Sequence, residues 1–228
     1  MIKQSNDFKL FARDHGVSSS VFDDYTKSVN NTYIEPTIVE ERRLNATSIS
    51  VFSRLFMDRI LFIGSGIDND VANIVNSQLL YLEMQDADKP VTMYINSPGG
   101  SVYDGLSIYD VMNYVNCPVV TTCIGIAASM GAVLLTSGEK GKRTALKHSK
   151  IMIHEPSTVI GPIRAKDLEV EAGEMVKCKE TLYRILSENS GKTYEEIAEL
   201  CKLDKWYSSD EAIENGMIDT IITKKNNR

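Results

Sequence analysis

Ser129 and His154 give this sequence its clearest chemical possibility, because a hydroxyl beside an imidazole can act as a nucleophile. Ser129 lies in Gly125–Ala132, a run of small residues between a strand-like segment and a helix-like segment. At such a turn the free N–H groups of the helix's first turn favour negative charge that develops beside the hydroxyl. Serine is also a common helix cap, and this stretch taken alone favours capping.

His154 follows directly on the strand-like run Lys150–Ile153, and His15 and His148 are the only other histidines. His148 lies among Lys and Ser residues, which is typical of a solvated turn. For His154 a base and a structural role are both open. An acid should orient the imidazole of a base, and spacing does not choose among the candidates. These are Asp167, Glu169, Asp204 and Asp210.

A third loop, Asn96–Gly100, follows another strand-like run. Its two consecutive glycines can turn backbone N–H groups toward a bound oxygen. In an open parallel sheet, sites form beyond the carboxyl ends of the strands. We therefore expect this loop, Ser129 and His154 to meet at one edge of a sheet.

Short apolar strands alternate with amphipathic helices along most of the chain, in the order β-α-β-α-β-α up to the helix after Ser129. This order predicts an α/β fold with a mainly parallel sheet and right-handed crossovers. One predicted helix begins after Asp68 and runs to about Met84, with Ile74 and Leu80 among its buried residues. A long helix rich in Glu and Lys is predicted over Leu168–Leu186.

The composition excludes several function classes. The 228 residues carry a net charge of −6 and an isoelectric point near 5.2, which argues against a nucleic-acid or anionic-membrane surface. No apolar run is long enough to span a membrane, and the first residues lack a signal-peptide core. The four cysteines show no C-x-x-C spacing, so we expect reduced thiols, no metal site and a cytoplasmic location.

Two parts of the chain differ in pattern. Residues 1–33 scatter a few aromatic residues among polar ones, and we interpret them as an N-terminal extension or a removable pro-segment. Residues 34–228 carry the regular alternation of elements and all three loops, which predicts a single core domain.

Several motifs together resemble the proteolytic subunits of the bacterial Clp protease, the ClpP family. The resemblance covers about Glu35 to the C-terminus. It implies a ClpP/crotonase-like fold of repeated β-α-β units with a protruding handle helix, and a serine endopeptidase of peptidase family S14. The motifs are Ile95–Gly100, Gly125–Ala132, Gly141–Arg143, Met152–Pro156 and Leu203–Trp206.

The resemblance also implies roles for particular residues. Ser129 would be the nucleophile, His154 the base, and Asp204 the acid that holds the imidazole. The backbone N–H groups of Gly100 and Met130 match the family's oxyanion hole. No metal or bound cofactor is implied.

By the same resemblance the chain would form heptameric rings that stack as a tetradecamer. An AAA+ unfoldase would feed unfolded protein into the barrel for protein quality control and would itself use the ATP. One departure lies beside the site, since the family usually has Gln where this chain has Glu155. Two alternatives stay open: a crotonase-like enzyme acting on acyl thioesters, and a non-catalytic ring subunit that pairs with an active paralogue.

Overall fold

The computed structural model describes three stretches of the chain, residues 37–42, 45–159 and 161–224. The chain divides into two compact units, Met1–Arg54 and Leu55–Arg228. The predicted boundary between residues 33 and 34 lies outside the described residues, so it stays a prediction.

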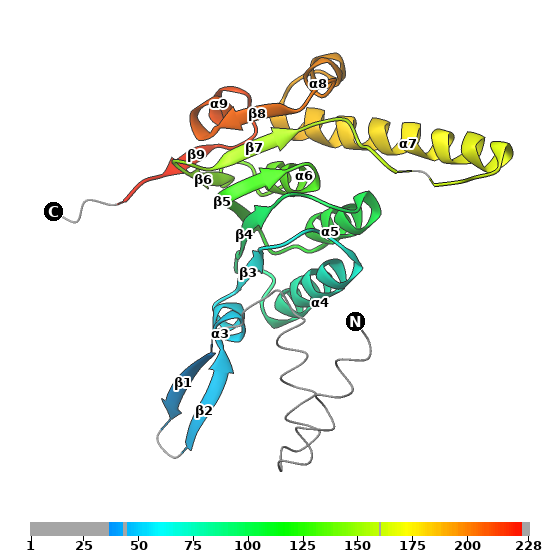
Figure 1. Cartoon of the computed structure of the whole chain (residues 1–228). Helices are drawn as coiled ribbons and strands as arrows, with labels where there is room; N and C mark the ends of the chain where they lie inside the picture. Colours follow the sequence, from blue (N-terminus) through cyan, green and yellow to red (C-terminus); the bar gives the residue numbers. More distant parts are fainter. Residues whose placement is uncertain (1–36, 43–44, 160, 225–228) are drawn as a thin grey trace, which may run out of the picture. The chain divides into compact units, whose positions relative to one another are not determined.

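The described part of the first unit is an antiparallel hairpin of two strands (Figure 1). Strand β1 is Thr37–Arg42 and strand β2 is Asn45–Ser50, with Thr37 opposite Ser50. Helix α3 (Val51–Met57) follows β2 and crosses the division between the units.

A single seven-stranded sheet organises the described part of the second unit. Five strands pair in the order β3-β4-β5-β6-β9 and are parallel, while β7 runs parallel to β5 and β8 antiparallel to β7. The predicted, mainly parallel sheet is therefore confirmed. Its strands are β3 (Ile60–Ile63), β4 (Val91–Ser97), β5 (Val119–Ala128), β6 (Thr144–Leu146), β7 (Lys150–Ile153), β8 (Lys205–Ser208) and β9 (Thr220–Ile222).

Strand β5 changes its partner along its length, and Gly125 makes the change possible. Thr122 and Cys123 of β5 pair with β6, whereas Ile126–Ala128 pairs with β7. Gly125 has φ +126°, and a Cβ there would lie 2.6 Å from Oδ1 of Asn96. The strand therefore continues through this glycine to Ala128, further than the strand-like segment before Gly125 indicated.

Helices α4, α5 and α6 lie side by side on one face of the sheet (Figure 1). Asp68 caps α4 as predicted, since its carboxylate accepts a hydrogen bond from the N–H of Val71. The helices of the second unit are α4 (Asn69–Gln85), α5 (Val102–Tyr114), α6 (Met130–Thr136), α7 (Ala165–Ser190), α8 (Tyr194–Leu200) and α9 (Ser209–Glu214).

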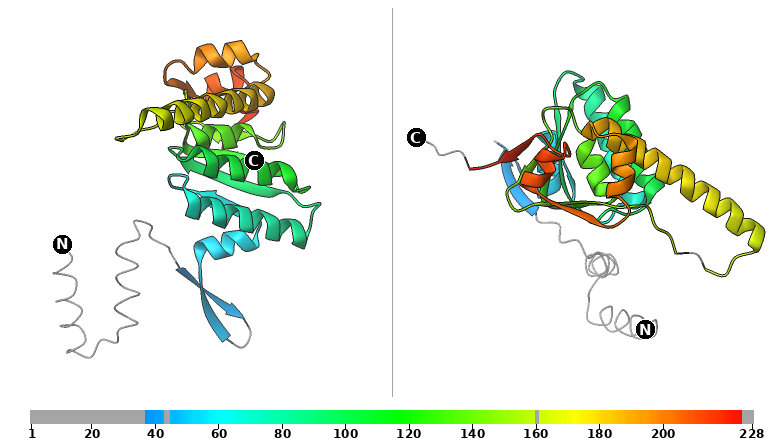
Figure 2. Two further views of the ribbon diagram at one scale, coloured as in Figure 1. Left: turned by 90° about the vertical axis from the view of Figure 1, so that its right-hand side faces the viewer. Right: turned by 90° about the horizontal axis from the view of Figure 1, so that it is seen from above.

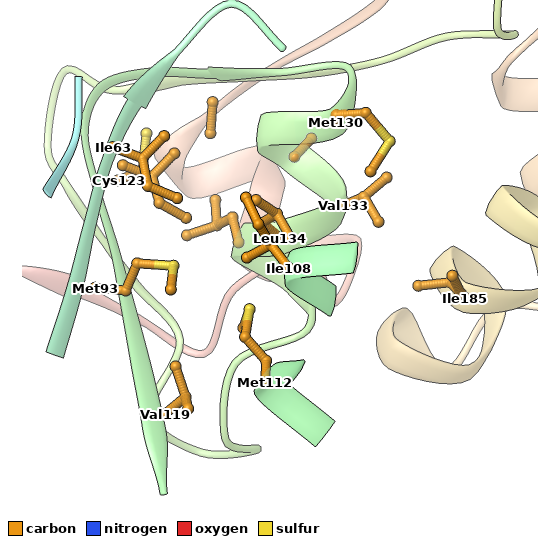
Figure 3. Close-up of a cluster of buried hydrophobic side chains, with 14 of the residues drawn as sticks. Ile63, Met93, Ile108, Met112, Val119, Cys123, Met130, Val133, Leu134 and Ile185 are labelled. Carbon is orange, nitrogen blue, oxygen red and sulfur yellow. The ribbon is translucent and has the colours of Figure 1, made fainter. Parts of the chain in front are cut away.

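The core fills the space between the sheet and this helical layer (Figure 3). Met93 from β4, Ile108 from α5 and Leu134 from α6 are fully buried there. The prediction that Ile74 and Leu80 are buried is wrong, because both side chains are exposed. The buried face of α4 instead follows a strict three- and four-residue step: Ala72, Val75, Leu79 and Leu82.

Helix α7 differs from the other helices in how it is covered. It has 26 residues, and its buried side chains all lie in its second half, from Cys178 to Leu186. The first half extends away from the sheet (Figures 1 and 2). It is longer than predicted at both ends and stops at Gly191, which adopts the left-handed conformation favoured by glycine. None of the helices in the described ranges is long and apolar enough to cross a membrane.

All four cysteines are buried free thiols, which confirms the prediction of reduced cysteines. Burial raises the pKa of Cys123 to about 11 and that of Cys201 to about 12. Thiols with such pKa values are overwhelmingly protonated at neutral pH, so these two cysteines are poor nucleophiles.

Candidate active site

Ser129 joins the end of β5 to the start of α6 with a strained backbone. Its φ of 55° and ψ of −123° are rare for a residue with a side chain, and such conformations cost about 1–3 kcal/mol. The N–H of Ser129 donates to the carbonyl of Met152 at 2.9 Å, which helps hold this turn. Although Ser129 occupies the N-cap position, its hydroxyl makes no capping hydrogen bond. The capping interpretation of Ser129 is therefore wrong.

The hydroxyl of Ser129 instead faces His154. Nε2 of His154 lies 2.9 Å from Oγ of Ser129, which is hydrogen-bonding distance. The sheet register explains this meeting, because β7 runs parallel to β5 with Ala128 paired to Met152. Ser129 and His154 each lie just beyond the last paired residue of neighbouring strands, at the same edge.

Asp204 reaches the same imidazole from the other side of β7. Its Oδ1 lies 3.3 Å from Nδ1 of His154. Strands β7 and β8 are antiparallel with Ile153 opposite Lys205, so continuing the register by one residue places His154 opposite Asp204. Of the four acids left open by the spacing, Asp204 is the one that contacts His154, whereas Asp167 pairs with Arg164.

The imidazole and the carboxylate differ in their access to solvent. The His154 side chain is 26% exposed and the Asp204 side chain is 64% exposed. Water therefore reaches the carboxylate more freely than the imidazole. His148, by contrast, is exposed in the turn before β7, as predicted for a solvated residue.

Two glycines shape the loop that faces Ser129. Gly99 has φ +95° and Gly100 has φ +154°, and the loop is tied to Ile67 by two backbone hydrogen bonds of 2.9 and 2.8 Å. A Cβ on Gly100 would lie 2.1 Å from the carbonyl oxygen of Ile67, so glycine alone fits there. A Cβ on Gly99 would lie 2.6 Å from Cβ of Ser129, so the loop packs directly against the strand-to-helix turn at Ser129.

Gly100 and Met130 line one pocket together with Ser129 and His154. Met130 is the first residue of α6, where backbone N–H groups have no partner within the helix. Among the described residues, neither N–H donates a backbone hydrogen bond. Both groups are therefore available to an oxygen atom bound beside Ser129.

The pocket at Ser129 has a volume of about 150 Å³, and its lining presents polar and apolar surface in about equal measure. Val102 and Val133 contribute from α5 and α6, and Ile153 contributes from β7. Leu182 and Leu186 of α7 line the pocket as well, although this helix was predicted only as a long helix and as the family's handle. No local sequence signal marks these two leucines as pocket residues, because their place depends on how the second half of α7 packs.

Glu155 connects the residues after β7 to helices α7 and α8. Its N–H donates to the carbonyl of Cys201 at 2.9 Å. Its carboxylate accepts a hydrogen bond from the Tyr183 hydroxyl at 3.5 Å and pairs with Lys179 at 3.5 Å. Burial and nearby negative charge raise the pKa of Tyr183 well above its ordinary value, so this hydroxyl remains a donor at neutral and alkaline pH.

A hydroxyl, an imidazole and a carboxylate in series at the edge of a mainly parallel sheet define a serine-hydrolase type of site. The profile of the Clp protease family matches residues 42–225. The chain belongs to this family, which is a family of serine endopeptidases with the α/β fold described above.

Relatives of the chain support the same assignment over almost its whole length. It is 49% identical over 222 residues to a protein of Porphyromonas gingivalis named ATP-dependent Clp protease proteolytic subunit, covering 96% of this chain and 98% of that protein. A protein of the same name from Bacteroides fragilis is 47% identical over 223 residues, covering 96% and 100%. The ATP-dependent Clp protease proteolytic subunit 3 of a Synechococcus strain is 48% identical over 178 residues, covering 78% and 89%.

Proposed function

We propose that this chain hydrolyses peptide bonds through an acyl-enzyme formed on Ser129. The observation that carries the proposal is the 2.9 Å contact between Oγ of Ser129 and Nε2 of His154 at a strained strand-to-helix turn. Backbone strain persists only where the surrounding structure stabilises it, and strained residues cluster at functional sites.

In the first half of the reaction, Oγ of Ser129 attacks the carbonyl carbon of the scissile bond. His154 takes the hydroxyl proton on Nε2, and its protonated Nδ1 donates to Asp204, which stabilises the imidazolium. The oxyanion that forms is bound by the N–H groups of Gly100 and Met130. The C–N bond then breaks as His154 gives the proton to the leaving amine, and the acyl group stays on Ser129.

In the second half, a water molecule gives a proton to His154 and attacks the acyl ester. The ester bond breaks, the proton passes to Oγ of Ser129, and the carboxylic product leaves. Neither half requires a metal ion or a bound cofactor, and we propose that the chain uses none.

The pocket beside Ser129 supports a preference for an apolar side chain next to the scissile bond. Its walls are formed by Val102, Val133, Leu182 and Leu186, and full burial of one large apolar side chain is worth about 1.5–3 kcal/mol. We therefore expect peptides with Leu or Met before the cleaved bond to be better substrates than peptides with Asp or Lys there.

We further propose that the chain works as one subunit of stacked heptameric rings in the cytoplasm. An AAA+ unfoldase would supply unfolded proteins and hydrolyse the ATP. The names of the relatives support this proposal, since they describe a proteolytic subunit of an ATP-dependent protease. Size measurement of the purified protein, and protein degradation with and without an unfoldase and ATP, test it.

The family match favours peptide hydrolysis over the two alternatives, a thioester enzyme and a non-catalytic subunit. Purified wild type and Ser129→Ala should be compared on a short fluorogenic peptide. Cleavage by wild type and none by the variant is expected. Cleavage by neither, from protein that assembles normally, would favour a non-catalytic subunit.

A further inference from the structure

We propose that Glu155 is a positioning residue that sets the width of the substrate pocket and thereby its selectivity. It does so by tying the segment after His154 to helix α7. The inference rests on the proposed function, because it concerns the substrate preference of the same site.

The carboxylate of Glu155 reaches two residues of α7 that lie one turn apart. Oε1 is 3.5 Å from Nζ of Lys179, and Oε2 accepts a hydrogen bond of 3.5 Å from the Tyr183 hydroxyl. Tyr183 is only 3% exposed and packs against the ring of Tyr194 in α8. One of the two anchoring groups is therefore itself held firmly in the core.

The same turns of α7 form the far wall of the substrate pocket. Leu182 and Leu186 line that pocket, and they alternate along the helix with Lys179 and Tyr183. The near wall is Ile153, His154 and Pro156. A change in the contacts of Glu155 therefore moves one wall of the pocket relative to the other.

Packing alone holds the segment after His154 weakly. Pro156 lines the substrate pocket on one side and a second cavity of about 280 Å³ on the other. This second cavity lies between residues 155–158 and the turns of α7 around Met175 and Lys179. With open space on two sides the segment loses packing contacts, so the polar contacts of Glu155 have a larger part in fixing its position.

The expected effect is modest because the ion pair is partly exposed. The side chains of Glu155 and Lys179 are 49% and 33% exposed, respectively. Pairs of this kind contribute little, so we expect the ratio of kcat/KM for Leu-containing over Ala-containing peptides to fall about two- to five-fold in Glu155→Ala. The fall should arise mainly in KM, since a looser pocket binds the larger side chain less well.

The test compares Glu155→Ala, Glu155→Gln and Lys179→Met with wild type on two fluorogenic peptides that differ only in Leu or Ala before the cleaved bond. The rate of Ser129 labelling by a small fluorophosphonate reports the reactivity of the nucleophile separately. Lys177→Met is the matched control, because Lys177 pairs with Glu174 on the same helix and lines neither cavity. The exchanged pair Glu155→Lys with Lys179→Glu tests whether the two residues act through each other.

We expect reduced selectivity in Glu155→Ala and Lys179→Met, with an unchanged labelling rate. The exchanged pair should recover part of the selectivity, because it restores the ion pair but its lysine cannot accept from Tyr183. Glu155→Gln should lie between wild type and Glu155→Ala, because an amide can still accept from Tyr183. The inference would be overturned if folded Glu155→Ala and Lys179→Met kept the selectivity of wild type. It would also be overturned if they lost no more selectivity than Lys177→Met. If wild type fails to label at Ser129, the proposed function fails instead, which is a distinguishable outcome.

Discussion

An acidic and a basic side chain form a pair near each end of helix α6, and the two pairs differ in burial and in the number of their hydrogen bonds. At the first end, the exposed Asp204 contacts His154, which contacts Ser129. At the other end, the buried Arg143 binds Asp219 through Nε and Nη2 and donates to the carbonyls of Thr136 and Asn189 through Nη1. At the Ser129 end the polar groups stay accessible on a strained backbone. At the Arg143 end the polar groups are hydrogen-bonded.

This difference separates what the two pairs contribute. Bonds to both oxygens of Asp219 fix β9 and the end of α7 to the end of α6, which stabilises the fold. The pair at Asp204 has few bonds and more contact with water, so it contributes little to stability. Substitutions at the Ser129 end should therefore change activity, whereas substitutions at the Arg143 end should change the free energy of unfolding.

The largest expected effect is on activity at the Ser129 end. His154→Ala should lower kcat/KM on a fluorogenic peptide by about 10⁴-fold or more, because no other base contacts Oγ of Ser129 in the described chain. The thermal unfolding temperature should stay near that of wild type. A loss of activity smaller than tenfold would contradict the proposed role of His154.

The next effect is on stability at the Arg143 end. Asp219→Ala leaves the buried Arg143 guanidinium without its carboxylate, and breaking such a pair typically costs about 3–5 kcal/mol in the free energy of unfolding. Asp204→Ala is the matched control and should cost less than about 1 kcal/mol. Urea unfolding of both variants measures the contrast, and equal losses would remove the distinction between the two ends.

A smaller loss of activity should follow from a change in the Gly99 loop where it packs against Ser129. Gly99→Ala would force its Cβ against Cβ of Ser129, and we expect kcat to fall about 10²–10³-fold, as when an oxyanion-hole donor is lost. Gly141→Ala is the control, because Gly141 also has positive φ but has no atom within 4 Å of the added Cβ. Its activity should match wild type although its backbone is strained. A wild-type kcat in Gly99→Ala, or an equal loss of kcat in both variants, would contradict the role of the contact with Ser129.

The smallest effect concerns acid stability. Burial raises the pKa of Asp219, but the hydrogen bonds from Arg143 and Gly141 outweigh burial and hold it below its usual value of 3.8. The carboxylate therefore stabilises the fold above pH 3.8, and this contribution disappears as the pH falls through the lowered pKa.

Wild type should accordingly lose stability below about pH 4 faster than Asp219→Asn does, with a difference of roughly 2–4 °C in unfolding temperature per kcal/mol. Thermal unfolding monitored by circular dichroism from pH 3 to 7 measures this difference. Parallel pH profiles of the two proteins would show that Asp219 is not the group responsible.

Much of the site could be predicted from the sequence because parallel strands end at a common edge. That rule brings the loops of Gly100, Ser129 and His154 together once the strands are recognised. The fold class followed from the alternation of strands and helices, the family followed from the resemblance of the motifs, and both are confirmed. The catalytic roles of these residues remain predictions, to be settled by the variants above.

What local pattern could not provide depends on long-range register. Only the family resemblance singled out Asp204, because it reaches His154 through β8, a short antiparallel strand with too few residues for a clear pattern. Leu182 and Leu186 reach the pocket because the second half of α7 docks beside α6, which local periodicity does not encode. The link from Glu155 to Lys179 likewise joins residues that only the packed helix brings together.

Covalent labelling of the wild-type protein with a fluorophosphonate, followed by mass spectrometric mapping, tests the central claim most directly. The account predicts a single adduct on Ser129, absent from Ser129→Ala and formed far more slowly in His154→Ala. No adduct on Ser129, combined with peptide cleavage that persists in Ser129→Ala, would contradict it.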